Sequence, residues 1–137
     1  MKSIKIILMS LMIVSLIFLI GCGGKPSGDL IKIQDAGFLT IEQCQVRGLQ
    51  DKVLMIESKY CSHCEATLPD FIQACAEKGV EPEILDVSVS KNRQKVYSYG
   101  LDYVYTPTFV FGCNYYIGAM PKTQYLSLLD KFLASQN

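Results

Sequence analysis

The stretch VLMIESKYCSHC, residues 53–64, decides the fold. Its first four residues are apolar without a break, which is typical of a strand buried within a sheet. From Ser62 onward, apolar side chains recur at the three- and four-residue spacing of one helix face, at Leu68, Phe71, Ile72 and Cys75. Two cysteines separated by two residues therefore lie where a buried strand passes into a helix.

This position favours a reactive role for the two cysteines. Cys61 is expected at the helix N-terminus, where unpaired N–H groups and the helix dipole favour a negative charge. A thiol in such a place ionises more readily, and the thiolate is the attacking species in disulfide exchange. Cys64 lies one turn deeper and can resolve a mixed disulfide formed by Cys61. A static structural disulfide is the alternative, since exported proteins often hold one.

The remaining chain predicts an alternation of strands and helices. Thr40 and Gln43 fit a capping box, and Gly residues follow the predicted helix ends. Strands are expected at 30–33, 84–87, 108–111 and 115–117, and helices at 41–47, 62–78, 91–99 with Ser90 as N-cap, and 121–133. Strands that alternate with helices run parallel, and the closing hairpin is antiparallel. The predicted fold class is α/β, a mixed sheet of four to five strands with helices on both faces.

Over about residues 30–133 the chain resembles the thioredoxin-like superfamily. The motifs that carry the resemblance are the Cys61-Ser62-His63-Cys64 motif, Pro69 in the following helix, Thr106-Pro107 before a late strand, and the closing hairpin and helix with Gly118. The resemblance implies a thiol-disulfide oxidoreductase that needs no cofactor and acts on protein thiols and disulfides. It makes Cys61 the nucleophile, Cys64 the resolving thiol and Pro107 a cis proline that faces the disulfide.

The same resemblance gives roles to neighbouring residues. Thr106 contributes backbone contacts to the substrate, and Tyr60 stands in the place of the usual tryptophan as a second substrate-binding residue. His63 is expected to stabilise the Cys61 thiolate, with a plain surface side chain as the alternative. Met55 falls near the buried aspartate of thioredoxins, so the proton acceptor for Cys64 is open, and Glu57 is the nearest acid.

The direction of the reaction is also left open. His63 inside the motif resembles the periplasmic oxidants and favours oxidation of dithiols. By analogy with the thioredoxin-like family, Thr106 before the proline favours reduction or isomerisation. The outcome depends on the reduction potential and on the membrane or extracytoplasmic partner that recharges the site.

Three further cysteines lie outside the motif. Cys75 follows Cys64 by eleven residues, almost on the same helical face, and is interpreted as a small core hydrophobe. By analogy of fold, Cys113 lies in a turn at the pole opposite the motif. A Cys75–Cys113 and a Cys44–Cys113 disulfide both remain open, because connectivity does not follow from sequence.

The N-terminal segment is interpreted as an export signal. Lys2 and Lys5 precede an apolar run over residues 6–20, which is shorter than a spanning helix needs. Residues 19–22, LIGC, resemble the bacterial lipobox, which implies cleavage before Cys22 and lipid on its sulfur. Residues 1–21 are thus the predicted signal peptide, 22–29 a lipidated cysteine with a flexible tether, and 30–137 the domain.

An uncleaved anchor helix is the alternative for this segment. Both interpretations place the domain outside the cytoplasm, beside a membrane, in the periplasm or at the cell surface.

Composition and length exclude other classes. The 13 Lys and Arg balance the 13 Asp and Glu without a basic stripe, which argues against nucleic-acid binding by charge. Half of the residues are hydrophobic, which excludes a disordered chain. A length of 137 residues fits one domain, and we expect a monomer.

Two rival functions remain. A copper or zinc protein is one, because Cys61, His63 and Cys64 are soft or borderline ligands. The chain has one His and no second CxxC pair, so the ligand set is incomplete and no metal site is predicted. A redox-inert thioredoxin-like binding domain is the other.

Overall fold

The computed structural model describes residues 29–137, so the predicted signal peptide, Cys22 and nearly all of the tether lie outside the described residues. The main sheet has five strands in the order β2-β7-β6-β3-β4. Their bounds are β2 Gly37–Phe38, β7 Asn114–Ile117, β6 Thr108–Phe111, β3 Val53–Glu57 and β4 Glu83–Asp86. β3 is parallel to β4 and antiparallel to β6, and β6 and β7 form the predicted antiparallel hairpin. The sheet is therefore mixed, as the sequence predicts.

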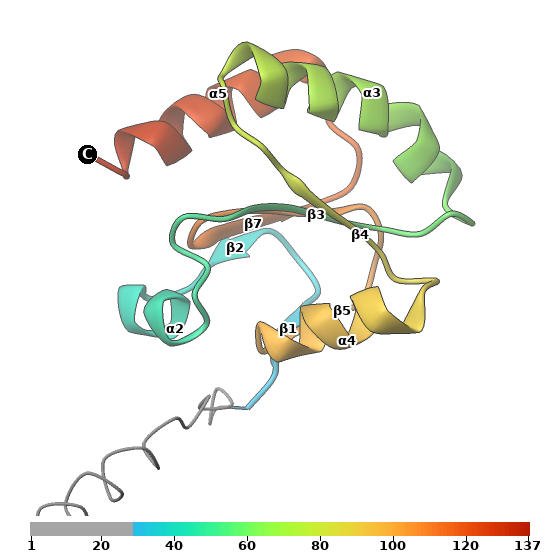
Figure 1. Ribbon diagram of the computed structural model, residues 1–137, viewed down its shortest axis with the longest axis vertical. Helices are drawn as coiled ribbons and strands as arrows, with labels where there is room; N and C mark the ends of the chain where they lie inside the picture. Colours follow the sequence, from blue (N-terminus) through green and yellow to red (C-terminus); the bar gives the residue numbers. More distant parts are fainter. Residues whose placement is uncertain (1–28) are drawn as a thin grey trace, which may run out of the picture.

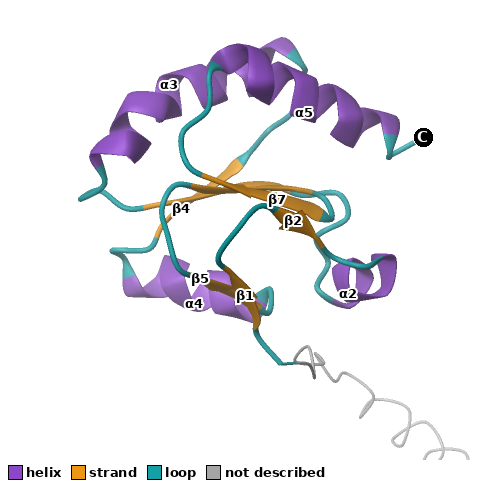
Figure 2. Ribbon diagram, turned by 180° about the vertical axis from the view of Figure 1, so that it is seen from behind, coloured by secondary structure: helices purple, strands orange, loops and turns teal. Residues whose placement is uncertain are grey.

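Helices cover both faces of this sheet, which confirms the predicted fold class. α3 (Ser62–Glu77) and α5 (Lys122–Ala134) lie together on one face (Figure 1). α2 (Ile41–Val46) and α4 (Ser90–Ser98) lie on the other face, together with a two-stranded parallel ribbon of β1 (Ile31–Ile33) and β5 (Leu101–Tyr103) (Figure 2).

β3 is buried on both sides, and its alternating side chains belong to two cores. Val53 and Met55 pack on the side of α3 and α5, with Phe71, Phe109 and Tyr125. Leu54 and Ile56 pack on the opposite side, with Ile33, Leu49 and Val96. A strand between two apolar layers needs apolar side chains at every position, which explains the unbroken run in the sequence.

A buried polar contact joins the two helices of the first core. The hydroxyls of Thr67 in α3 and Tyr125 in α5 lie 2.6 Å apart. The Tyr125 hydroxyl also accepts the backbone N–H of Met120 at 3.1 Å. Because all three groups are buried, this network fixes α5 against α3, the helix that begins at the cysteine motif.

Three details differ from the sequence-based predictions. β1 is not a strand of the main sheet but pairs with β5, and neither β5 nor the edge strand β2 was predicted. β2 and β5 have only two and three residues, too few to show an alternation. Ser90 is not the N-cap of α4: Val89 is, without a side-chain hydrogen bond, and Ser90 is the first helical residue.

The predicted capping box is confirmed at α2. Thr40 Oγ1 accepts the Gln43 N–H at 3.1 Å, and Gln43 Oε1 accepts the Thr40 N–H at 3.0 Å. Within residues 29–137, the longest helix is the 16-residue α3, and none of the helices is long and apolar enough to cross a membrane.

Candidate active site

The cysteine motif lies at the junction of β3 and α3. Cys61 is the N-cap of α3, and its Sγ accepts the backbone N–H of Cys64 at 3.2 Å. The two cysteines form a disulfide with their Cα atoms 5.2 Å apart. Cys61 is half-buried, whereas Cys64 is fully buried against the first core. The outer sulfur is therefore that of Cys61, the arrangement expected of a nucleophile with a resolving thiol beneath it.

The Thr106–Pro107 segment lies beside this sulfur. β6 runs antiparallel to β3 with Thr108 opposite Ile56, so the start of β6 lies next to the end of β3. The Thr106–Pro107 peptide bond is cis, as the resemblance implies, and the carbonyl oxygen of Thr106 lies 3.4 Å from Cys61 Sγ. Residues 45 positions apart in the sequence thus form one surface around the outer sulfur.

Two exposed aromatic side chains adjoin the same surface. Tyr60 is 82% exposed and Tyr105 is 58% exposed, each next in sequence to a residue of the Cys61–Thr106 contact. The Lys59 ammonium lies 4.9 Å from the centre of the Tyr60 ring. His63 is exposed on the first turn of α3. Cys61 and Thr106 each thus have an exposed ring next to them in the sequence.

The acids near the motif lie at the ends of β3 and β4. Met55 is fully buried in the first core together with Cys64, so no carboxyl group occupies that position. Glu57 lies two residues farther, on the same face of the strand, and pairs with Asp86 in register. Burial, and then the Asp86 carboxylate, raise the pKa of Glu57. Ser88 and the Lys59 N–H, both bonded to Asp86, lower the pKa of Asp86.

Comparison with known proteins adds two similar structures. No protein-family model and no curated protein sequence matches the chain. A chloroplastic thioredoxin z matches over 78% of this chain and 96% of its own, at 17% identity and a TM-score of 0.46. A thioredoxin from Aeropyrum pernix matches over 72% of this chain and 95% of its own, at 21% identity and a TM-score of 0.41.

The fold is thioredoxin-like. This follows from the chain's own geometry: a mixed five-stranded sheet with β3 between β6 and β4, the CxxC motif between β3 and α3, and the cis proline before β6. Helices on both faces and the final hairpin and helix complete the arrangement.

The remaining cysteines resolve the open question of pairing. Cys44 in α2 and Cys113 in the β6–β7 turn form a disulfide, with Cα atoms 5.3 Å apart. A Cys75–Cys113 bond is thereby excluded. Cys75 is a free, fully buried thiol, which confirms its interpretation as a core side chain, and burial raises its pKa to about 12.

The second disulfide lies at the other end of the sheet from the first. In the β3–β6 pair, Val53 lies opposite Phe111 at one end, and Ile56 lies opposite Thr108 at the other. Cys113 follows the first end and Cys61 the second, so Cys113 lies at the pole predicted for it. In the described part of the chain, no three His, Cys, Asp or Glu side chains come together as a possible metal site.

Proposed function

We propose that this chain is a membrane-anchored, extracytoplasmic thiol-disulfide oxidoreductase that uses Cys61 and Cys64 on protein substrates. One observation carries the proposal. The half-buried Cys61 sulfur caps α3 and lies 3.4 Å from the Thr106 carbonyl oxygen, with the fully buried Cys64 bonded to it from below. One reachable sulfur and one protected sulfur are what a two-step exchange needs.

In the reducing direction, the exchange has two steps. The Cys61 thiolate attacks a substrate disulfide, so that a Cys61–substrate bond forms and one substrate sulfur leaves as thiolate. The Cys64 thiolate then attacks Cys61 Sγ, which closes the Cys61–Cys64 bond and releases the second substrate thiolate. Two electrons pass to the substrate, and oxidation of a dithiol is the same sequence reversed.

Stabilisation of the Cys61 thiolate comes from the start of α3. The Cys64 N–H points at Cys61 Sγ over 3.2 Å, and a hydrogen bond to a charged group is worth about 1.5–3 kcal/mol. The positive end of the helix dipole adds about 0.3–1 kcal/mol. His63, on the same exposed turn, is the proposed side chain that tunes the potential of the pair.

Substrate binding is assigned to the surface around the outer sulfur. The backbone of Thr106 lies beside Cys61, the buried Pro107 shapes the loop that presents it, and Tyr60 offers an exposed ring. The edge of a peptide could bond to the Thr106 backbone while its cysteine reacts with Cys61.

Proton transfer to Cys64 is assigned to Glu57. Its carboxyl group follows Met55 on the face of β3 that packs against α3, the helix that contains Cys64. Burial, and then the Asp86 carboxylate, raise the pKa of Glu57, which is the direction that favours acid–base work nearer neutral pH. A Glu57→Gln variant should therefore lose the part of the pH dependence of activity that arises from titration of Glu57.

Membrane anchoring is proposed from the lipobox resemblance at residues 19–22. Seven peptide steps separate Cys22 from Asp29, where the described domain begins, and they span at most about 25 Å when extended. The domain would thus act on exported proteins close to the membrane. Mass spectrometry of the protein extracted from membranes tests this: the N-terminal fragment should begin at a diacylated Cys22, and an unmodified Met1 terminus would contradict it.

The activity is tested with the full chain in detergent micelles, in two assays: reduction of a protein disulfide and oxidation of a dithiol peptide. Cys61→Ser should abolish both, and Cys64→Ser should accumulate a mixed disulfide at Cys61. Cys75→Ala is the matched control, because Cys75 is a buried thiol outside both disulfides. Full activity of Cys61→Ser would contradict the proposal and favour the redox-inert binding domain.

A further inference from the structure

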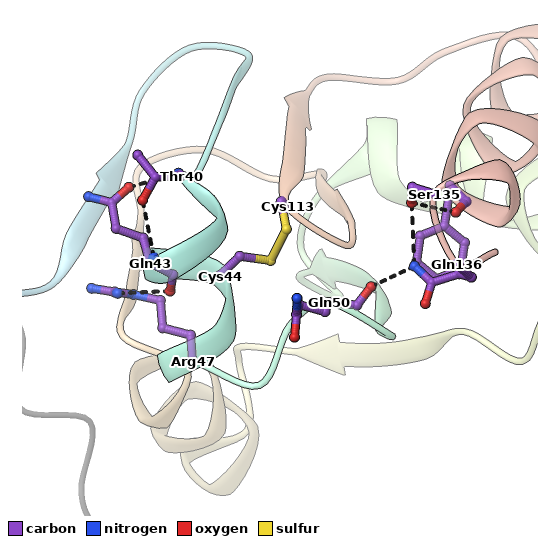
Figure 3. The surroundings of a disulfide bond; sticks show 9 residues. Thr40, Gln43, Cys44, Arg47, Gln50, Cys113, Ser135 and Gln136 are labelled. Atoms are coloured by element: carbon purple, nitrogen blue, oxygen red, sulfur yellow. Dashed lines mark hydrogen bonds between the residues drawn. A yellow bond between two sulfur atoms is a disulfide. The ribbon is translucent and has the colours of Figure 1, made fainter.

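The Cys44–Cys113 disulfide lies beside a surface hollow that the proposed function does not use. The hollow measures about 640 Å³, within the range of known ligand sites. Cys113 lines it, together with Ile41 of α2, Gln50 before β3, and Gln136 beyond α5. Figure 3 shows the disulfide and, beside it, the hydrogen bond of 2.9 Å from Gln136 Nε2 to the Gln50 carbonyl oxygen.

The two residues of this bond are not equally accessible. Cys44 is fully buried in the second core, whereas Cys113 is half-buried and borders the hollow. A nucleophile that enters the hollow therefore meets Cys113 and not Cys44. Access selects which sulfur of a disulfide is attacked, so Cys44 becomes the leaving sulfur.

The two cysteines also lie on elements that differ in how strongly the rest of the fold holds them. Cys113 lies in the turn of the β6–β7 hairpin, where its carbonyl oxygen accepts the Leu39 N–H at 2.7 Å and the adjacent Gly112 N–H bonds to the Lys52 carbonyl oxygen at 2.8 Å. Cys44 lies on α2, which has six residues and no other buried side chain. Helices this short are not stable by themselves. The attacked sulfur is thus held in place, while the leaving sulfur lies on an element that can move away.

We propose that Cys44–Cys113 is a second thiol-exchange site, which a protein dithiol enters through the hollow and attacks at Cys113. The first partner thiolate bonds to Cys113 Sγ, the Cys44–Cys113 bond breaks, and Cys44 leaves as a thiolate that takes a proton from water. The second partner thiolate then attacks the partner's own sulfur in the mixed disulfide. The partner gains a disulfide, and Cys113 leaves as a thiolate and is protonated; two electrons have passed to this chain.

Reduction has a structural consequence for the start of the domain. Arg47, the C-cap of α2, is buried and donates to the carbonyl oxygens of Gly100 at 3.5 Å and Asp29 at 3.0 Å. When the disulfide opens, only non-covalent contacts such as these hold α2, so we expect α2 and the chain at Asp29 to become more mobile. This site does not require the proposed function of Cys61 and Cys64.

The test uses the full chain with Cys61→Ser and Cys64→Ser, in detergent micelles, so that the first pair cannot contribute. The protein is incubated with glutathione as the probe thiol, without denaturant, and sampled over time. Peptide mapping by mass spectrometry then measures the glutathione adduct on Cys44 and Cys113. Alkylation of Cys75 in the same samples reports opening of the whole fold, because this thiol is fully buried in the first core.

We expect the adduct on Cys113 to exceed that on Cys44 about tenfold or more, because access decides the attacked sulfur. We also expect reduction of the pair to precede alkylation of Cys75. Equal adducts, an adduct chiefly on Cys44, or no reduction while the fold stays intact would each overturn the proposal. Reduction that keeps pace with Cys75 alkylation would overturn it too, since the bond would then open only on unfolding.

A variant of the hollow adds a second comparison. Ile41→Trp places a large ring at the hollow, and Ile72→Trp makes the same change at an exposed position on α3. Ile41→Trp should slow formation of the Cys113 adduct about threefold or more, because access controls the attack, and Ile72→Trp should leave the rate unchanged. Equal rates in the two variants would contradict an approach through the hollow.

Discussion

Removal of the Cys44–Cys113 disulfide should lower the free energy of unfolding of the oxidised protein by about 4 kcal/mol. The two cysteines are 69 residues apart, so the bond closes a long loop in the unfolded chain. The chain-entropy relation gives about 4 kcal/mol for a loop of this length at 25 °C. The same relation gives less than about 2 kcal/mol for Cys61–Cys64, whose separation is three residues.

The assay is equilibrium unfolding in guanidinium chloride at neutral pH without reductant. It compares Cys44→Ala, Cys113→Ala and the double variant with the Cys61→Ala/Cys64→Ala variant. Each single change breaks the same bond. The loss of unfolding free energy in each single variant should therefore nearly equal the loss in the double variant, and the two single losses should not add. For a domain of this size, the double variant should melt about 20 °C below the unaltered protein.

Cys75→Ala is the control for replacing a buried sulfur outside any cross-link. The reasoning would be refuted if the double variant lost no more stability than the Cys61→Ala/Cys64→Ala variant. Additive single losses would refute it as well, because the two side chains would then contribute through packing and not through their bond.

Three further predictions concern the core, the acids and the rival function. Tyr125→Phe should cost about 2–3 kcal/mol in chemical unfolding, because it removes the bond to Thr67 and leaves the buried Met120 N–H unpaired; Tyr60→Phe, at an exposed ring, should cost nothing measurable. The pKa of Glu57 is raised in the folded protein, so its protonated form favours folding. This contribution to stability is fully present below the unfolded pKa, about 4.3, and is lost as pH rises through the folded pKa. Glu57→Gln should therefore unfold at higher denaturant than the unaltered protein at pH 7 and at the same denaturant at pH 3, whereas Asp86→Asn, which removes a carboxylate of lowered pKa, should be destabilised at pH 7. An Asp86→Asn variant as stable as the unaltered protein at pH 7 would contradict this assignment. Zinc titration of the fully reduced chain should show no binding below micromolar concentration, because a stable site needs four ligands; tight binding lost in His63→Ala would support the metal-handling alternative.

The candidate site could be predicted where its determinants are local in sequence. The apolar run of β3, the start of α3 and the two cysteines between them lie within twelve residues, so periodicity and spacing alone indicate a CxxC motif at a helix N-terminus. Thr106 lies 45 residues downstream of Cys61, and Pro107 follows it. Only the family resemblance connected them to the motif, because no local pattern reports that β6 returns beside β3.

Features that depend on distant packing could not be predicted. The sequence left two pairings possible, Cys75–Cys113 and Cys44–Cys113. The packing of α2 against the β6–β7 turn decides for Cys44–Cys113. The apolar alternation at residues 30–33 predicted a strand, but its partner β5 has only three residues and no recognisable pattern. The hollow beside Cys113 is formed by four separate segments, so the sequence near Cys113 does not predict it.

The central claim is that Cys61 and Cys64 form a redox-active pair, and their reduction potential tests it most directly. The full chain in micelles is equilibrated with glutathione or dithiothreitol redox buffers, and the state of each cysteine pair is determined by peptide mapping. We predict a transition of the Cys61–Cys64 pair between about −270 and −120 mV, the range of working thiol-disulfide oxidoreductases. A potential below about −300 mV, typical of static structural disulfides, would contradict it.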